Sequence, residues 1–305
     1  MKRSLLLGTI VCAGLIVMGL GLSAQQPARG GAGGQGRGGG GLGPIGTIQK
    51  MADTLYMIPG AGGNTAVFIT ANGVVLVDTK LADNGQAILN QVKTVTNKAV
   101  THIINTHTHG DHTGSNDFFP ASVEIIVQEN TAANMAKMAY FKDPARKHGL
   151  PDKTYKDKMT VLSGKDAIDL YYYGAAHTNG DAWVVFRGLR TMHAGDAFAA
   201  KGTPLIDANN GGSGMAFPQT LDRAVAGIKN VDTVITGHST IMKWADLKDF
   251  ADFNRMFLDA ARAARKAGKT PEQAAAEFKL PEKFKDYNVG RAATNFTLIF
   301  GELKK

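Results

Sequence analysis

The chain has 305 residues, of which 44% are hydrophobic, 8% aromatic and 20% charged. This balance excludes a disordered or collagen-like protein and provides enough apolar residues to bury one substantial core. The formal charge is +8, and four of the basic side chains lie in residues 1–46, which contain no acid. The excess on the rest of the chain is too small to indicate a nucleic-acid partner, and we expect none.

The first 24 residues have the features of a secretory signal peptide. Residues 1–3 are positively charged, residues 5–22 are apolar, and Leu22-Ser23-Ala24 forms a small-residue cleavage site. We therefore expect a secreted or periplasmic protein without further membrane contact. An uncleaved membrane anchor is the alternative, because the apolar run approaches the ~18 residues that span a bilayer.

Residues 25–46 are dominated by glycine and contain almost no apolar side chain, so we expect a disordered linker. Cys12 is the only cysteine and lies inside the leader. The mature chain would thus have no thiol, and any metal must be held by histidines and carboxylates.

From residue 47 onward, predicted strands and helices alternate. Residues 65–70 and 74–78 are strands that flank Ala71-Asn72-Gly73, a strong signal for a hairpin. Helices are then predicted at 83–95, 130–141, 219–229 and 244–266, and strands at 100–105, 123–127, 167–173, 182–186, 189–193 and 233–236. The alternation predicts an α/β catalytic domain at 47–243, followed by a helical extension at 244–305 that packs on it. We expect Leu247, Phe250, Phe253 and Phe257 of this extension to be packing residues.

The order of elements also looks duplicated. A strand ending at Asp78 is followed, one helix later, by a strand ending at His107. In the second half, a strand leading to Asp196 is followed, one helix later, by a strand ending at His238. Two such halves predict two sheets packed face to face with helices outside, and ligands bound where the strand ends meet.

The segment His107-Thr108-His109-Gly110-Asp111-His112 carries the chemistry. In an extended chain, alternate side chains share a face, so His107, His109 and Asp111 are expected to point the same way. Gly110 permits a turn, and a short helix starting at Thr113-Gly114-Ser115 would bring His112 to the same pocket. Three imidazoles and a carboxylate within six residues suit Zn²⁺.

From about residue 54 to 244, the sequence resembles the metallo-β-lactamase superfamily. The resemblance rests on Val77-Asp78-Thr79, the segment from His107 to His112, Gly174-Ala175-Ala176-His177-Thr178-Asn179-Gly180-Asp181, His193-Ala194-Gly195-Asp196 and Gly237-His238. It implies a four-layer αβ/βα sandwich of two packed mixed sheets with outer helices.

The resemblance also implies two zinc ions per chain. One would be bound by His107, His109 and His177, and the other by Asp111, His112 and His238. Asp196 would bridge both ions beside a hydroxide, and Asp111 and Asp196 would be the catalytic carboxylates. Asp78 would be a buried structural carboxylate and not a ligand.

Four further residues are candidates for a role near this site. We expect His193 to be a partner of the site or a core histidine, and Asp181 either to orient His177 or to cap a loop. Lys201 and Asn209 are candidates for holding a substrate carboxylate or oxyanion; no other substrate-binding residue is indicated.

The resemblance implies a hydrolase whose metal-bridging hydroxide attacks the carbonyl of a small-molecule ester, lactone, thioester or β-lactam. The second metal site of the family's true β-lactamases commonly uses a cysteine, or another arrangement without a bridging aspartate. Here Asp196 fills that place, so the sequence looks more like the thioester- and lactone-cleaving branches. Two alternatives stay open: a mononuclear iron oxygenase-type member, and a non-catalytic metal-binding protein that has kept the fold. The sequence does not indicate the oligomeric state.

Overall fold

The computed structural model describes residues 43–304. The predicted signal peptide, residues 1–24, and residues 25–42 of the predicted linker lie outside this range. Across residues 43–304, no helix combines the length and the apolar character that a membrane span requires.

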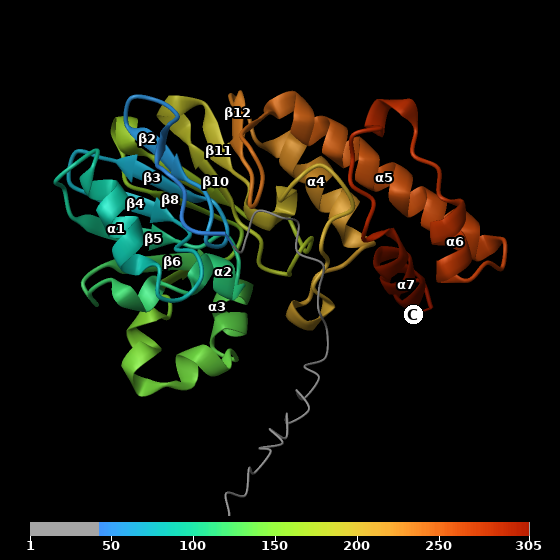
Figure 1. The fold of residues 1–305 in the computed structure, drawn as a ribbon, viewed down its shortest axis with the longest axis horizontal. Helices are drawn as coiled ribbons and strands as arrows, with labels where there is room; N and C mark the ends of the chain where they lie inside the picture. Colours follow the sequence, from blue (N-terminus) through green and yellow to red (C-terminus); the bar gives the residue numbers. More distant parts are fainter. Residues whose placement is uncertain (1–42, 305) are drawn as a thin grey trace, which may run out of the picture. The chain divides into compact units, whose positions relative to one another are not determined.

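Within the described residues, the strands form two mixed sheets (Figure 1). The seven-stranded sheet contains, in spatial order, β1 (Gln49–Lys50), β2 (Leu55–Ile58), β3 (Thr65–Ile69), β4 (Val74–Val77), β5 (Val100–Ile104), β6 (Glu124–Gln128) and β7 (Lys153–Tyr155). The six-stranded sheet contains β13 (Met242–Lys243), β12 (Thr233–Ile235), β11 (Thr191–His193), β10 (Trp183–Phe186), β9 (Ile168–Tyr171) and β8 (Lys158–Val161). The pairs from β4 to β7 and the pair β11–β12 are parallel, and the other pairs are antiparallel.

The α-helices of the described range lie outside the two sheets. They are α1 (Gly85–Lys93), α2 (Gly110–Thr113), α3 (Glu129–Met135), α4 (Ala216–Gly227), α5 (Trp244–Lys266), α6 (Pro271–Glu277) and α7 (Ala292–Glu302). α1 and α3 pack on the seven-stranded sheet, whereas α4 and α5 pack on the six-stranded one. This is the four-layer arrangement expected from the sequence, and that prediction is confirmed.

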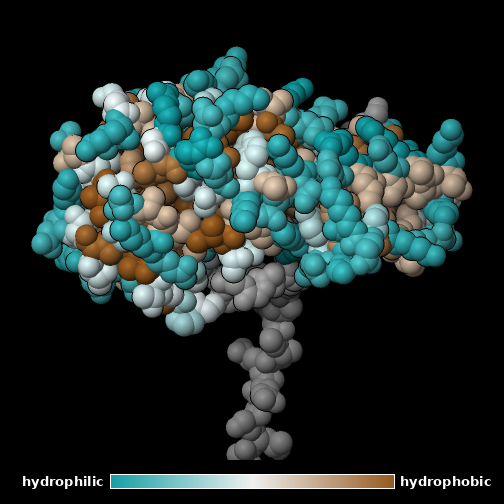
Figure 2. Space-filling model, turned by 90° about the horizontal axis from the view of Figure 1, so that it is seen from above, coloured by the Kyte–Doolittle hydropathy of each residue, from teal (hydrophilic) through white to brown (hydrophobic). Residues whose placement is uncertain are grey.

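Three apolar clusters separate the four layers, and strand periodicity explains them. Along β4, Val75 and Val77 point between the sheets, while Val74 and Leu76 point toward α1. Both sets are fully buried because helices and a second sheet cover the two faces. On the face shown in Figure 2, hydrophilic residues predominate. Among large hydrophobic side chains of residues 43–304, only Phe118 and Ile241 are exposed.

Most predicted elements are present with boundaries shifted by a few residues. The hairpin across Ala71-Asn72-Gly73 forms as β3–β4, and the long helix predicted at 244–266 is α5. The helix predicted at 130–141 is wrong in its second half, because α3 ends at Met135 and residues 136–138 lead into a separate short 3₁₀ turn.

The helical extension shares a core with the six-stranded sheet. Leu247, Phe250, Phe253 and Phe257 of α5 are all buried in the apolar cluster that contains α4 and the outer face of β10. These four side chains therefore have the packing role that the sequence predicts. The boundary between domain and extension at residue 244 stays a prediction.

Candidate metal centre

The side chains singled out in the sequence follow the carboxyl ends of four strands. Asp78 follows β4, His107 follows β5, Asp196 follows β11 and His238 follows β12. Because β4 and β5 are parallel, and β11 and β12 are parallel, each pair opens at one sheet edge. The side-chain distances below show that these two edges meet.

The segment from His107 to His112 turns into a helix earlier than the sequence predicts. His109 is extended, with φ −63° and ψ 145°, and α2 begins at the next residue, Gly110. The predicted helix start at Thr113 is therefore wrong, since α2 ends there. An extended run through Asp111 is wrong for the same reason. The helical turn places the ring of His112 against that of His107, with ring centroids 4.1 Å apart, and a nitrogen of each ring groups with the carboxylate of Asp196.

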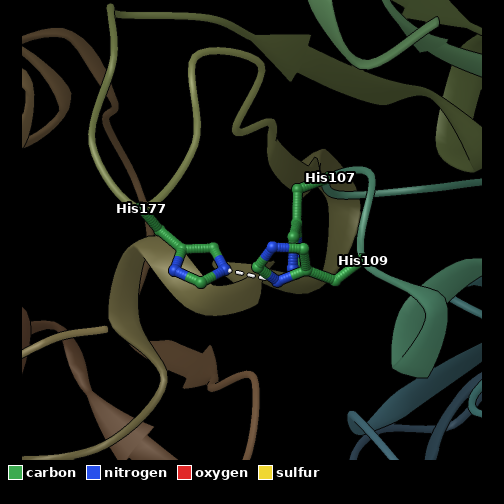
Figure 3. Close-up of side chains that lie close together, drawn as sticks. All are labelled: His107, His109 and His177. Carbon is green, nitrogen blue, oxygen red and sulfur yellow. Dashed lines mark hydrogen bonds between the residues drawn. The ribbon is translucent and has the colours of Figure 1, made fainter. Parts of the chain in front are cut away.

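His107, His109 and His177 form the first cluster, drawn in Figure 3. Nε2 of His177 lies 3.0 Å from Nδ1 of His109, and one nitrogen from each of the three rings lies within 4.8 Å of the others. Nε2 of His107 is buried and has no hydrogen-bond partner in the protein. Three ring nitrogens thus converge on one point.

Asp111, His112 and His238 form the second cluster. Nε2 of His238 lies 3.2 Å from Nε2 of His112 and 3.3 Å from Oδ2 of Asp111. This set has the composition that the family resemblance implies for a second metal.

Asp196 lies between the two clusters. Its Oδ1 is 3.4 Å from Nε2 of His112, and its Oδ2 is 3.3 Å from Nε2 of His238 and 3.7 Å from Nε2 of His177. Oδ1 is buried and has no hydrogen-bond partner in the protein. One carboxylate is therefore within reach of ligands from both sets.

In the first cluster, an oxygen atom engages the outer nitrogen of each ring. His177 Nδ1 donates to the Leu205 carbonyl at 2.8 Å, and His109 Nε2 donates to the Asp207 carboxylate at 2.7 Å. The Thr106 hydroxyl donates its only proton to Asp78, so it accepts from His107 Nδ1 at 3.0 Å. In its neutral form, each ring would use its single N–H outward and turn an unprotonated nitrogen toward the cluster.

The charges of the two clusters differ. Burial lowers the pKa of His107 well below its ordinary value and lowers that of His177 to about 4, with neighbouring imidazoles adding to the effect. In the second cluster, burial lowers the pKa of His238, but the carboxylates of Asp196 and Asp111 outweigh this effect and raise that pKa to about 9. The pKa of Asp196 stays well below its ordinary value because His238 and His112 overcome the effect of burial. Positive charge on the imidazoles is thus favoured in the second cluster and disfavoured in the first.

Asp181 and His193 lie outside both clusters. The Asp181 carboxylate accepts from the backbone N–H and the hydroxyl of Thr178, so it caps the loop after His177. Burial raises its pKa to about 7. Nε2 of His193 donates to the Asn64 carbonyl at 2.9 Å, and its Nδ1 accepts from the N–H of Gly195. This histidine links the two halves of the fold.

The two candidate substrate ligands are placed on loops. Nζ of Lys201 lies 2.7 Å from Oδ1 of Asp246, at the start of α5, so its charge is already paired. Asn209 is exposed, and its N–H donates to Asp207. The substrate-binding role of both residues stays a prediction.

Two residues that hold the site were missed in the sequence. One is Asp207, the partner of His109. The other is Asn64, whose amide donates to the carbonyls of Thr236 and Ser239 and whose N–H donates to that of Gly237. Asn64 thereby clamps the turn that presents His238. A possible signal was Asp207 followed by Asn209-Asn210, because aspartate readily caps such turns.

Comparisons with known proteins agree with this architecture. A family model described as "Metallo-beta-lactamase superfamily" matches residues 59–239. The uncharacterized protein YobT of Bacillus subtilis (strain 168) is 29% identical over 140 residues, which are 43% of this chain and 60% of that protein. The chain thus spans about three fifths of the length of that curated relative.

Solved structures show the same fold. A metallo-β-lactamase from Pontibacter korlensis matches with a TM-score of 0.58 and 18% identity, covering 70% of this chain and 99% of that one. The stereoselective inverting sec-alkylsulfatase Pisa1 from Pseudomonas sp. matches with a TM-score of 0.72 and 14% identity, covering 84% of this chain and 50% of that one. Since the family model covers more than half of the sequence and the clusters lie inside the matched range, the chain belongs to the metallo-β-lactamase superfamily.

Proposed function

We propose that the protein is a secreted hydrolase that uses two zinc ions to attack the carbonyl carbon of an ester, lactone, thioester or β-lactam and cleave its acyl C–O, C–S or C–N bond. One observation carries the proposal. Nε2 of His177 and Nδ1 of His109 face each other at 3.0 Å, beside the partnerless Nε2 of His107. Three imidazole nitrogens that meet at one buried point offer three ligand atoms to a cation, and imidazole nitrogen is a preferred zinc ligand.

The chain's residues fit a two-metal site. His107, His109 and His177 would hold one zinc, and Asp111, His112 and His238 the other, with Asp196 within reach of both. When bound, zinc supplies a Lewis acid for the carbonyl oxygen and lowers the pKa of water toward neutrality. Asp111 and Asp196 give two negative charges against two dications, so the residues leave a net positive site that favours an anionic transition state.

A second candidate reaction is hydrolysis of a sulfate ester. The observation that favours it is the alkylsulfatase match, which has a TM-score of 0.72 and covers 84% of the chain, against 0.58 and 70% for the β-lactamase from Pontibacter korlensis. A share of 84% is large enough to include part of the helical extension.

A substrate panel read together with metal content tests both reactions. The purified protein is assayed for zinc, iron and manganese, and then offered a chromogenic cephalosporin, a lactone, a thioester, a carboxylic ester and a secondary alkyl sulfate. We expect about two zinc ions per chain and turnover of one class that a chelator abolishes and zinc restores. One iron per chain with oxygen consumption, or turnover that survives chelation, would refute the proposal.

Export is proposed from the sequence of residues 1–24. Sequencing the amino terminus of protein recovered from the periplasm or medium tests it. A terminus at Gln25 is the expected result, and a full-length chain retained in the membrane fraction would show the anchored alternative.

A further inference from the structure

Helix α7 is hydrogen-bonded to both ends of one loop, residues 204–215, which precedes α4. At one end, Nδ2 of the buried Asn295 donates to the Pro204 carbonyl at 3.0 Å. At the other end, the Glu302 carboxylate accepts from Ser213 Oγ at 2.7 Å and from the N–H groups of Gly214 and Met215 at 2.9 and 3.0 Å. Asn295 and Glu302 are seven residues apart, so they lie two turns apart on the same face of the helix.

The helix also packs closely on the loop between these two contacts. A Cβ atom added to Gly214 would lie 2.5 Å from Cγ1 of Ile299, so only glycine allows this approach. Beside the contact lies a cavity of about 470 Å³, lined by Ala208, Gly212, Ser213, Leu298, Gly301 and Glu302. The loop therefore has a packed end at Gly214 and an open part near Ala208.

The middle of the same loop carries the outer partners of two ligands in the first cluster. The Leu205 carbonyl accepts from His177 Nδ1, and the Asp207 carboxylate accepts from His109 Nε2. The N–H of Asp207 also donates to the His177 carbonyl at 2.8 Å. Movement of this loop would therefore rotate both imidazoles.

We propose that α7 is a positioning element of the first metal cluster, in which Asn295 and Glu302 hold the loop that orients His109 and His177. The proposal rests on the proposed function in that it takes this cluster to bind a metal. Outer partners of metal-binding histidines fix the ring orientation, and losing one typically costs about 10–100-fold in metal affinity. A residue that holds such a partner in place acts through the same hydrogen bonds.

The second cluster provides an internal control. Its ligand His238 is presented by a turn that Asn64 clamps, and His112 is held by Asp78. Neither support involves residues 204–215 or α7. Loss of the α7 contacts should therefore affect the two clusters unequally, whereas general destabilisation would weaken both.

The test compares Glu302→Ala and Asn295→Ala with Thr294→Ala, an exposed position on the same helix. Cobalt titration of the full chain gives a dissociation constant for each cluster, with the absorption bands assigned by His177→Ala and His238→Ala. We expect each of the first two variants to weaken the first cluster by about 10-fold or more. In these two variants, the metal affinity of the second cluster should stay within about twofold of the natural chain. In Thr294→Ala, the affinities of both clusters should do so. Amide hydrogen exchange should accelerate in residues 205–213 and not in residues 59–64.

Glu302→Gln keeps a hydrogen-bond acceptor without the charge, so its first-cluster affinity should lie between those of the natural chain and Glu302→Ala. This variant carries the test if the alanine variants do not fold. Unchanged affinity in the first cluster, or equal loss in both, would overturn the proposal. If the natural chain binds no metal, the proposed function fails by itself. In that case unchanged exchange in residues 205–213 would still refute a holding role for α7.

Discussion

Oδ2 of Asp78 lies 2.7 Å from Nδ1 of His112, and both side chains are fully buried. The same carboxylate accepts the hydroxyl proton of Thr106, which in turn accepts from Nδ1 of His107. Asp78 therefore fixes the ring orientation of one histidine in each cluster, directly for His112 and through a hydroxyl for His107. The two contacts of Asp78 thus give this buried carboxylate, which lies outside both clusters, a structural role at the end of β4.

Removing a nitrogen ligand should empty the first cluster. We expect His107→Ala and His177→Ala each to lower zinc content to about one ion per chain and the rate by more than about 100-fold, because two remaining imidazoles hold zinc poorly. Metal analysis and turnover measure this. His148→Ala is the matched control, since His148 is exposed and donates to the Asp117 carbonyl. Two metals bound at normal affinity in either variant would show that the ligands are wrongly assigned.

Gly237 leaves no room for a side chain beside Asp196. An added Cβ would lie 1.9 Å from Oδ1 of Asp196 and 2.8 Å from the Gly195 carbonyl oxygen. We expect Gly237→Ala to displace Asp196 or the turn that carries His238, lowering the free energy of unfolding by about 1–3 kcal/mol and weakening metal binding. Gly43→Ala is the control, because nothing lies within 4 Å of its added Cβ. Equal zinc affinity and stability for both variants would contradict the prediction.

Lys80 should make stability depend on pH. It is fully buried, its Nζ donates to the carbonyls of Ile58 and Gly63, and burial lowers its pKa to about 7 although Asp78 acts in the opposite direction. An unfolded lysine keeps its proton up to about pH 10. Between these two values the unfolded state binds more protons, so the contribution of Lys80 to stability rises with pH.

The measurement is urea unfolding of the natural chain and Lys80→Met from about pH 7 to about pH 10. The difference in unfolding free energy should rise with pH in favour of lysine, by up to about 1.4 kcal/mol per pH unit. Lys98→Met is the matched control, since Nζ of Lys98 also donates to two carbonyls but the residue is exposed. If the difference in unfolding free energy between the natural chain and Lys80→Met did not change with pH, the lowered pKa of Lys80 would be wrong.

The metal-site segments were predictable because their information is local. His107 to His112 place four candidate ligands, three histidines and one aspartate, within six residues, and Asn72-Gly73 marks a hairpin wherever two alternating strands flank it. The layered fold followed from the alternation of such elements. The start of α2 at Gly110 was missed because the alternating pattern of His107, His109 and Asp111 is also compatible with a strand.

The supports of the site could not be found in the same way. Asp207 lies 98 residues from His109 in the sequence, and Asn64 lies 172 residues from Thr236. The packing of the loops determines which residues these side chains contact, and a short sequence motif carries no information about that packing. The strands β1, β2, β7, β8 and β13 were also not predicted. β1 and β13 have two residues each, so only the neighbouring strand in the sheet defines them.

Asp196 should decide between one-metal and two-metal behaviour. Two dications at ~3.5 Å repel strongly at any protein dielectric, and Asp196 is the carboxylate within reach of His177, His112 and His238. Asp196→Asn keeps the shape and removes the charge, so the second zinc should leave first and the rate should fall by about 100-fold or more. Zinc titration and turnover measure this beside Asp181→Asn, a buried carboxylate outside both clusters. Two tightly bound zinc ions and a full rate in Asp196→Asn would make Asp196 purely structural and end the two-metal proposal.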